Sequence, residues 1–165
     1  MPSLQDILES RDNRCARQME LLKLYPACTL ICFTVQLPGP EKRNALSLEI
    51  AKKGVEALRG EFAAPLFEEE RDLETGFEAF LVVDGTPEEV KSRCCRIEDS
   101  HPLGRLMDID VIERGEPPVP LSRNRLGLPE RKCLICGRPV RLCMREKSHS
   151  YAELLQKIAE MVDSC

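Results

Sequence analysis

Residues 27–37, ACTLICFTVQL, form the longest apolar run in the chain, and Pro38 follows them directly. The run is rich in β-branched side chains and ends at a proline, which predicts a buried strand. It is too short to cross a bilayer and contains Thr29 and Thr34, so we expect neither a membrane span nor a membrane partner. The other elements of the predicted fold are assigned outward from this strand.

The chain on either side of this run alternates between helical and strand patterns. Upstream, Ser3 and Asp6 have the spacing of a capping box, which predicts a helix over about 3–25. Downstream, the apolar spacing and the turn residues predict, in order, a helix at 47–62, strands at 66–72 and 77–83, a helix from Thr86 to about Glu98, and a strand at 105–113.

The last third of the chain has a different character. Residues 115–130 are rich in Pro and predict an irregular connection. Ser150 and Glu153 form a second capping box that predicts the start of a final helix. The length of 165 residues predicts a single domain, 1–165. Its expected parts are the N-terminal helix (about 3–25), a core (about 27–113), and a basic Cys-containing segment with the C-terminal helix (about 122–163).

The predicted order within the core is strand, helix, strand, strand, helix, strand. This order predicts the α+β class with a ferredoxin-like core and flanking N- and C-terminal helices. The palm of many nucleotidyl-transferring enzymes has the same order. This is an analogy between folds, so it makes such an enzyme compatible with the chain without selecting one.

The composition excludes several classes of protein. Aromatic residues make up 4% of the chain, Trp is absent, and the net charge is -4. These values argue against a nucleic-acid partner, because such proteins need aromatic faces for stacking or a basic surface. The N-terminus carries charges where a signal peptide needs an apolar core, which predicts a cytoplasmic protein. We therefore expect the nine cysteines to be reduced.

The charge is unevenly distributed along the chain. Residues 122–149 hold eight Lys or Arg against two Glu, a balance of +6, which leaves -10 for the rest of a chain of net charge -4. A basic segment beside an acidic body indicates a bound anion. The alternative is a solvated basic face, and the charge pattern alone does not separate the two.

Residues 104–111, GRLMDIDV, carry the sharpest functional signal. On a strand, the apolar residues at odd positions would face the core, and Asp108 and Asp110 would share the opposite face. Two neighbouring carboxylates repel each other unless a cation offsets their charge, and Mg²⁺ prefers carboxylate and phosphate oxygens. We therefore predict a Mg²⁺ site at Asp108 and Asp110. The alternative is a half-buried strand with both Asp side chains on its solvated face.

Cys133, Cys136, Cys143 and His149 follow one another with the spacing Cys-x2-Cys-x6-Cys-x5-His. Thiolate and imidazole ligands suit tetrahedral zinc, so these four residues could bind Zn²⁺. The central spacing is shorter than is usual for such a site, and the surrounding pattern is not that of a thioredoxin-like redox pair. We therefore favour cysteines used as small buried apolar residues and keep zinc as the alternative.

Five segments together resemble one family. They are LPGPEKRN at 37–44, ETGFEAF at 74–80, HPLGRLMDIDVI at 101–112, SRNRLGLPERKCLICG at 122–137 and CMREKSHS at 143–150. Their combination is similar to the citrate lyase holo-acyl-carrier-protein synthase family, also described as apo-citrate lyase phosphoribosyl-dephospho-CoA transferase. The resemblance covers nearly the whole chain. The chain departs from the family pattern at Gln36, where Asn is expected.

The resemblance implies a nucleotidyltransferase reaction. A serine hydroxyl of the acyl carrier protein (gamma) subunit of citrate lyase would attack the inner phosphorus of a triphosphoribosyl-dephospho-CoA donor. Diphosphate would leave, and a phosphodiester would link the serine to the prosthetic group. The implied partners are therefore the apo carrier subunit and this donor. The nucleophile belongs to the carrier, so no catalytic serine is needed in this chain.

The resemblance also extends the set of candidate site residues beyond the Asp pair. Lys42, Arg105, Arg123 and Arg131 are expected at the triphosphate. Arg145 and His149 are expected at a phosphate or at the proton that the incoming serine loses. On the residues alone, Lys42 follows the Pro-Gly-Pro sequence at 38–40 and favours a plain surface turn.

Two other functions remain open at this stage. The first is a zinc-ribbon-like interaction module held together by the three cysteines and His149. The second is a nucleotidyltransferase that uses another donor and another carrier protein. Stoichiometric zinc would favour the first, and transfer from ATP would favour the second.

Overall fold

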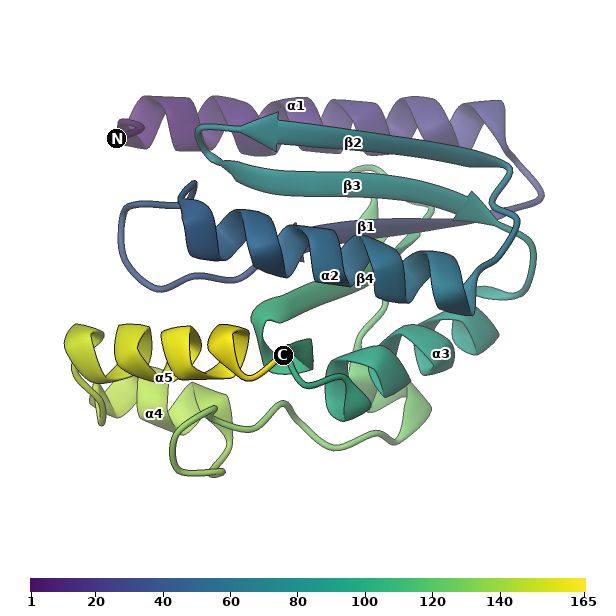
Figure 1. Cartoon of the computed structure of the whole chain (residues 1–165). Coiled ribbons are helices and arrows are strands. Elements are labelled where there is room, and N and C mark those ends of the chain that lie inside the picture. The colour runs from purple at the N-terminus through teal and green to yellow at the C-terminus, as the bar shows by residue number, and fades with distance from the viewer.

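The computed structural model describes residues 1–165 and contains one antiparallel sheet of five strands in the order β2-β3-β1-β4-β5. Figure 1 labels β2, β3, β1 and β4 of this sheet. The predicted buried strand is β1, and it lies in the middle of the sheet because both of its edges are paired, one with β3 and one with β4. The strands are β1 Thr29–Val35, β2 Phe67–Leu73, β3 Gly76–Val83, β4 Met107–Glu113 and β5 Val119–Pro120.

Four of the five helices begin at a side chain that caps them, and the helix Val140–Glu146 is the exception. Ser3, Thr86 and Ser150 each accept a hydrogen bond from a backbone N–H of the first turn, as the sequence predicts. Asn44 caps another helix in the same way, through a capping box with Ser47 that the sequence analysis missed. None of the helices combines the length and the apolar character that crossing a membrane requires. The helices are α1 Leu4–Leu24, α2 Ala45–Glu61, α3 Pro87–Ser100, α4 Val140–Glu146 and α5 Tyr151–Asp163.

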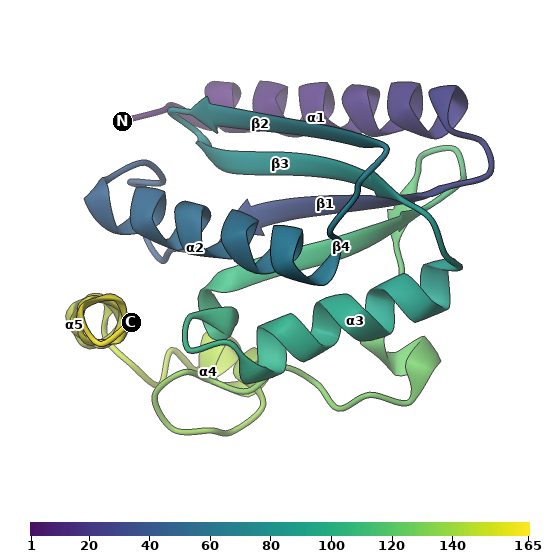
Figure 2. The same ribbon diagram turned by 45° about the vertical axis from the view of Figure 1, so that its right-hand side comes forward.

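The sheet separates two apolar clusters. The larger cluster lies between the sheet and helices α2, α3 and α5, and it includes Phe33, Ile50 and Ile158. The smaller cluster lies under α1, on the opposite face, and includes Leu21 and Phe80. Figure 2 shows the same arrangement, with α1 on one side of the strands and α2 and α3 on the other. The alternation of side chains along each strand therefore directs each residue to one face of the sheet or the other.

The α+β class is confirmed, and the predicted order of strands and helices over residues 29–113 is observed. The strand that carries the Asp pair is two residues shorter than predicted. It begins at Met107, because Gly104–Leu106 forms a 3₁₀ turn, so Arg105 does not lie on the strand. The short helix α4 and the short strand β5 were not predicted, because neither has enough residues to show a hydrophobic period.

Candidate active site

The Asp pair lies on β4 in the predicted orientation. Met107, Ile109 and Val111 are buried in the larger cluster, whereas Asp108 and Asp110 point to the α1 side of the sheet. Their side chains are 31% and 35% exposed, so solvent and ligands can reach both. The two carboxylates therefore share one accessible face of the sheet.

The charges around the Asp pair are incompletely balanced. Burial, with the neighbouring charge of Asp108, raises the pKa of Asp110 to about 6. Lys91 opposes this effect from α3, with its Nζ 3.6 Å from Asp110 Oδ1. Asp108 accepts a hydrogen bond from Gln36 Nε2 at 2.9 Å and lies 3.6 Å from Arg131 Nη1. An additional cation at this place would relieve the remaining repulsion between the carboxylates.

Side chains form hydrogen bonds to the outer edge of β4 over residues 107–109, where no neighbouring strand pairs with it. Arg131 donates to the carbonyl of Met107 at 2.6 Å and to that of Gly104 at 3.0 Å. Lys91 donates to the carbonyl of Ile109 at 3.0 Å, and Glu98 accepts the N–H of Ile109 at 3.1 Å. These bonds satisfy edge groups that would otherwise be unpaired, and they fix the backbone on both sides of Asp108.

Glu98 also connects this edge to the basic segment. It is 3% exposed, and its second carboxylate oxygen accepts a hydrogen bond from Arg123 at 2.8 Å. Arg131 Nε lies 3.7 Å from the same oxygen. Arg123 is also paired with Asp99 at 3.0 Å. Both arginines are therefore held in place by carboxylates of α3 at the border of the Asp pair.

Gly104 sets the approach of the 3₁₀ turn to α3. A Cβ at this position would lie 2.3 Å from the carbonyl oxygen of Glu98 and 2.6 Å from that of Ile97. Only glycine permits such a contact with backbone atoms. The close approach brings the start of β4 against the end of α3, where Glu98 can reach it.

A pocket beside the Asp pair lies against the basic segment, and we call it the basic pocket after that segment. Its volume is about 580 Å³, which falls within the range of roughly 300–1,000 Å³ that is common for small-molecule sites. Both Asp side chains border it. Four cationic residues line it, namely Lys91, Arg123, Arg131 and Arg141, together with four acidic ones, namely Glu98, Asp108, Asp110 and Glu130. Three of these four belong to the basic segment, so the structure brings that segment to the Asp pair.

Lys91 is a site residue that the sequence analysis missed. It is 4% exposed although lysine is seldom buried. A signal was present, because Lys91 and Glu98 stand seven residues apart and Cys94 and Cys95 lie between them on the same face of a helix. Two charged residues on the apolar face of a helix predict that both side chains are buried and bonded to polar groups. The sequence pattern does not identify the strand that provides those groups.

A second hollow lies on the other side of Asp108 and has a volume of about 350 Å³. Lys42 and Gln36 line it together with Arg14 of α1. Lys42 donates to the carbonyl of Leu37 at 2.7 Å, and burial lowers its pKa. Asp108 borders both this hollow and the basic pocket, so one long ligand could contact it from either side.

Two of the predicted arginines lie apart from both hollows. Arg105 makes no ion pair, and its Nε is buried without a partner. Burial, with the nearby charges of Arg131 and Arg123, lowers its pKa. Arg145 is exposed on α4 and is also unpaired. The predicted role of either residue at a phosphate is therefore not supported by its position.

His149 lies with the cysteines. The ligand atoms of Cys133, Cys136, Cys143 and His149 all lie within 4.8 Å of one another. His149 borders neither hollow beside the Asp pair. The geometry therefore gives no support to its predicted role as the base that deprotonates a serine.

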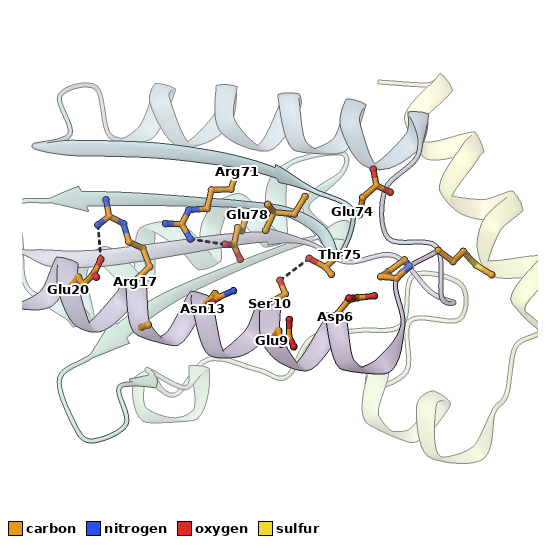
Figure 3. Close-up of a pocket in the computed structure, with 14 residues that line it drawn as sticks. Asp6, Glu9, Ser10, Asn13, Arg17, Glu20, Arg71, Glu74, Thr75 and Glu78 are labelled. Carbon is orange, nitrogen blue, oxygen red and sulfur yellow. Dashed lines mark hydrogen bonds and ion pairs between the residues drawn. The ribbon is translucent and has the colours of Figure 1, made fainter.

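A larger and more open hollow, of about 780 Å³, lies between α1 and the β2–β3 hairpin and contains none of the predicted site residues (Figure 3). Its arginines are already paired, Arg17 with Glu20 and Arg71 with Glu78. Its other charged side chains are acidic. A net acidic surface of this kind is unsuited to a polyanionic substrate. The basic pocket has as many cationic as acidic residues, and two of the acidic ones are the predicted metal ligands Asp108 and Asp110, so it is the candidate active site.

A carboxylate pair beside a basic pocket is typical of an enzyme that acts on a phosphorylated substrate. The comparisons with known proteins identify the family. The family model described as apo-citrate lyase phosphoribosyl-dephospho-CoA transferase matches residues 2–165. The chain therefore belongs to the apo-citrate lyase phosphoribosyl-dephospho-CoA transferase family.

Curated relatives agree with this assignment. A protein of Streptococcus pyogenes named "probable apo-citrate lyase phosphoribosyl-dephospho-CoA transferase" is 34% identical over 164 residues, which cover 98% of this chain and 85% of the relative. Proteins of Shigella boydii and Escherichia coli named "apo-citrate lyase phosphoribosyl-dephospho-CoA transferase" are each 37% identical over 171 residues, which cover 99% of this chain and 91% of theirs. This family is a transferase family, which favours the enzyme over an interaction module.

Proposed function

We propose that this protein transfers the phosphoribosyl-dephospho-CoA prosthetic group to apo-citrate lyase. The observation that carries the proposal is the position of Asp108 and Asp110 at a basic pocket in a chain that belongs, over nearly its full length, to this family. The names of the relatives state the same transfer. We further propose that the enzyme acts in the cytoplasm.

The proposed donor is triphosphoribosyl-dephospho-CoA, and the proposed acceptor is a serine of the acyl carrier protein subunit. The serine oxygen forms a bond to the inner phosphorus of the donor. The bond from that phosphorus to the diphosphate breaks, and the diphosphate leaves with the bonding electrons. The serine proton passes to a base. The reaction needs cationic groups around a polyanion and little covalent chemistry from the protein, which agrees with a pocket lined by Lys and Arg.

Asp108 and Asp110 would hold a Mg²⁺ ion. The residues fit this ion, because two half-buried carboxylates on one face that solvent can reach provide the hard oxygen ligands that it prefers. The raised pKa of Asp110 agrees with the assignment, because burial and the neighbouring charge of Asp108 both disfavour its ionised form, which a bound cation would stabilise. When bound, the ion would supply positive charge to phosphate oxygens during the transfer.

The protein's own cations would bind and orient the donor. We place the reacting phosphorus near Asp108, which borders both hollows, so that the long donor extends into each of them. Arg123 and Arg131, which both line the basic pocket, would contact the triphosphate. Lys42 would contact the part of the donor in the smaller hollow. Because Glu98 fixes both arginines in advance, little side-chain entropy would be lost when the donor binds.

The carrier protein would dock on the basic side of the molecule. The basic pocket opens between α3 and the segment that contains Ser122 and Arg141. Arg141 is 82% exposed, and its one ion pair is to exposed Glu130. Such a surface favours approach of an acidic partner from the side of the basic segment.

The direct test is the intact mass of purified apo carrier subunit after incubation with this protein, Mg²⁺ and the donor. The expected result is a mass gain equal to the donor minus diphosphate. The variant Asp108→Asn with Asp110→Asn should abolish the gain, whereas the exposed control Asp163→Asn should retain it. Transfer from ATP in place of the donor would indicate another substrate, and no gain with folded protein would reject the proposal. A gain that persists in the double variant would move the metal site elsewhere.

A further inference from the structure

The four residues Cys133, Cys136, Cys143 and His149 form the one cluster of three or more potential metal ligands in the chain. All four ligand atoms lie within 4.8 Å of one another, and the Sγ atoms of Cys136 and Cys143 are 3.3 Å apart. Around tetrahedral zinc, Zn–S distances of about 2.3 Å and Zn–N distances of about 2.0 Å hold the ligand atoms about 3–4 Å from one another, so small side-chain shifts would close this cluster around the ion. The cluster therefore has the size of a zinc site.

His149 provides an independent observation. Its Nε2 atom is buried and has no hydrogen-bond partner. Buried polar atoms nearly always have a partner, so an unpaired ring nitrogen beside three thiols is unusual. Coordination of a metal ion by the imidazole would satisfy this atom.

The backbone around Cys133 is shaped to hold a sulfur ligand. The N–H of Ile135 donates to Cys133 Sγ at 3.5 Å, and the N–H of Gly137 donates to the carbonyl of Cys133 at 3.1 Å. Gly137 has a φ of +70°, which side chains other than glycine rarely adopt. This tight turn brings Cys136 back beside Cys133 and orients both sulfur atoms toward one point.

The rest of the segment shows how a short spacing can supply four ligands. Helix α4 places Cys143 facing the turn, and Lys147 ends the helix in the left-handed region with a φ of 50°. The chain then returns, so that His149 reaches the three sulfur atoms. The spacing that argued against zinc in the sequence is thus accommodated by a helix that the sequence analysis missed.

The charge next to the cluster also suits a zinc site. A Zn²⁺ ion with three thiolates and one neutral imidazole has a net charge of -1. The Arg138 guanidinium lies 3.6 Å from Cys143 Sγ and would offset that charge. Arg138 also donates hydrogen bonds to Glu146 Oε2 at 3.2 Å and to Ser148 Oγ at 2.9 Å.

A disulfide bond or a purely apolar role for the cysteines would account for less of this geometry. A disulfide between Cys136 and Cys143 needs an S–S distance of about 2.05 Å; the observed 3.3 Å is a non-bonded contact, and a disulfide would leave Cys133 and His149 without a role. Cysteines used as apolar residues should be buried, but Cys136 is exposed. Only a metal ion gives each of the four residues a role.

We propose that Cys133, Cys136, Cys143 and His149 bind a structural Zn²⁺ ion. Four protein ligands leave no open position for a substrate, so the ion would act in folding and not in the transfer reaction. The site would fix Arg131, which stands two residues before Cys133 and pairs with the edge of β4. It would also fix the start of α5, because His149 directly precedes the cap Ser150.

The test measures metal content and does not depend on the proposed function. Full-length protein, purified under reducing conditions and incubated with Zn²⁺ before removal of free metal, should contain one zinc per chain. The variant Cys136→Ser changes an exposed side chain, so it should fold and lose the zinc. The control Cys165→Ser, also exposed, should retain it. Zinc well below one per chain in folded wild-type protein, or equal zinc in both variants, would overturn the proposal.

Cobalt gives a second readout that reports the ligands themselves. Co²⁺ in a site with three thiolates and one imidazole should show the visible bands of tetrahedral cobalt and a thiolate-to-cobalt charge-transfer band. Cys136→Ser should lose both, and His149→Gln should weaken binding while the thiolate band persists. Removing the metal with a chelator should lower the Tm of the wild type and leave that of Cys136→Ser unchanged. A colourless cobalt complex, or a Tm that the chelator does not move, would contradict a structural site.

Discussion

Replacement of Glu98 by alanine tests whether α3 holds the strand that carries the Asp pair. Glu98 is 3% exposed and serves three groups at once: the N–H of Ile109, the guanidinium of Arg123 and that of Arg131. Its removal would leave the N–H unpaired at the edge of β4 and two cations without a buried counter-charge. We expect a large loss of stability from this single change.

The magnitude follows from these contacts. An unpaired buried N–H costs about 1–3 kcal/mol, and loss of one partner of a buried ion pair costs about 3–5 kcal/mol. The two costs are not additive, because Arg123 keeps Asp99 at 3.0 Å and Arg131 keeps its carbonyl partners. We therefore expect the free energy of unfolding to fall by about 3–4 kcal/mol. For a chain of this size, this corresponds to a Tm lower by about 6–16 °C.

The assay is chemical and thermal unfolding followed by circular dichroism. Glu98→Gln keeps an acceptor for Ile109 and loses only the charge, so its stability should lie between those of Glu98→Ala and the wild type. The matched control is Arg125→Ala, which removes exposed ion pairs to Glu113 and Glu88. Such surface pairs contribute at most about 1 kcal/mol. If Glu98→Ala costs no more than Arg125→Ala, the reasoning about the edge of β4 is wrong.

Three further predictions concern neighbouring positions. In EDTA, Asp110→Asn should raise the free energy of unfolding above about pH 7 and have no effect below about pH 4. The reason is that the pKa of Asp110 is about 6 in the folded protein and 3.8 ordinarily, so the folded protein loses stability as the pH rises from about 4 to about 6 and the buried carboxyl ionises. Denaturant titrations at several pH values measure this loss. Gly104→Ala should cost about 1–3 kcal/mol through its contact with the Glu98 carbonyl, whereas Gly60→Ala, which meets no atom, should stabilise α2 by up to about 1 kcal/mol. Thr86→Ala should cost about 1 kcal/mol through loss of the cap of α3.

Local features of the fold were predictable from the sequence. The caps at Ser3, Thr86 and Ser150 depend on residues three positions apart, so the sequence contains all the information that they need. The same is true of β4, where a period of two residues assigns Asp108 and Asp110 to one face whatever the strand pairs with. The class of the fold and the position of the Asp pair were therefore correct without coordinates.

The sequence alone determined which residues share a face, and only the tertiary structure decided what those faces meet. The strand order leaves the outer edge of β4 beside α3, and this brings Lys91 and Glu98 to backbone groups that lie at least 11 residues away along the chain. The turn and helix α4 gather three cysteines around His149, which separates that histidine from the Asp pair. Side chains of opposite charge select their partners by distance in space, and that distance is set by the packing of the whole chain.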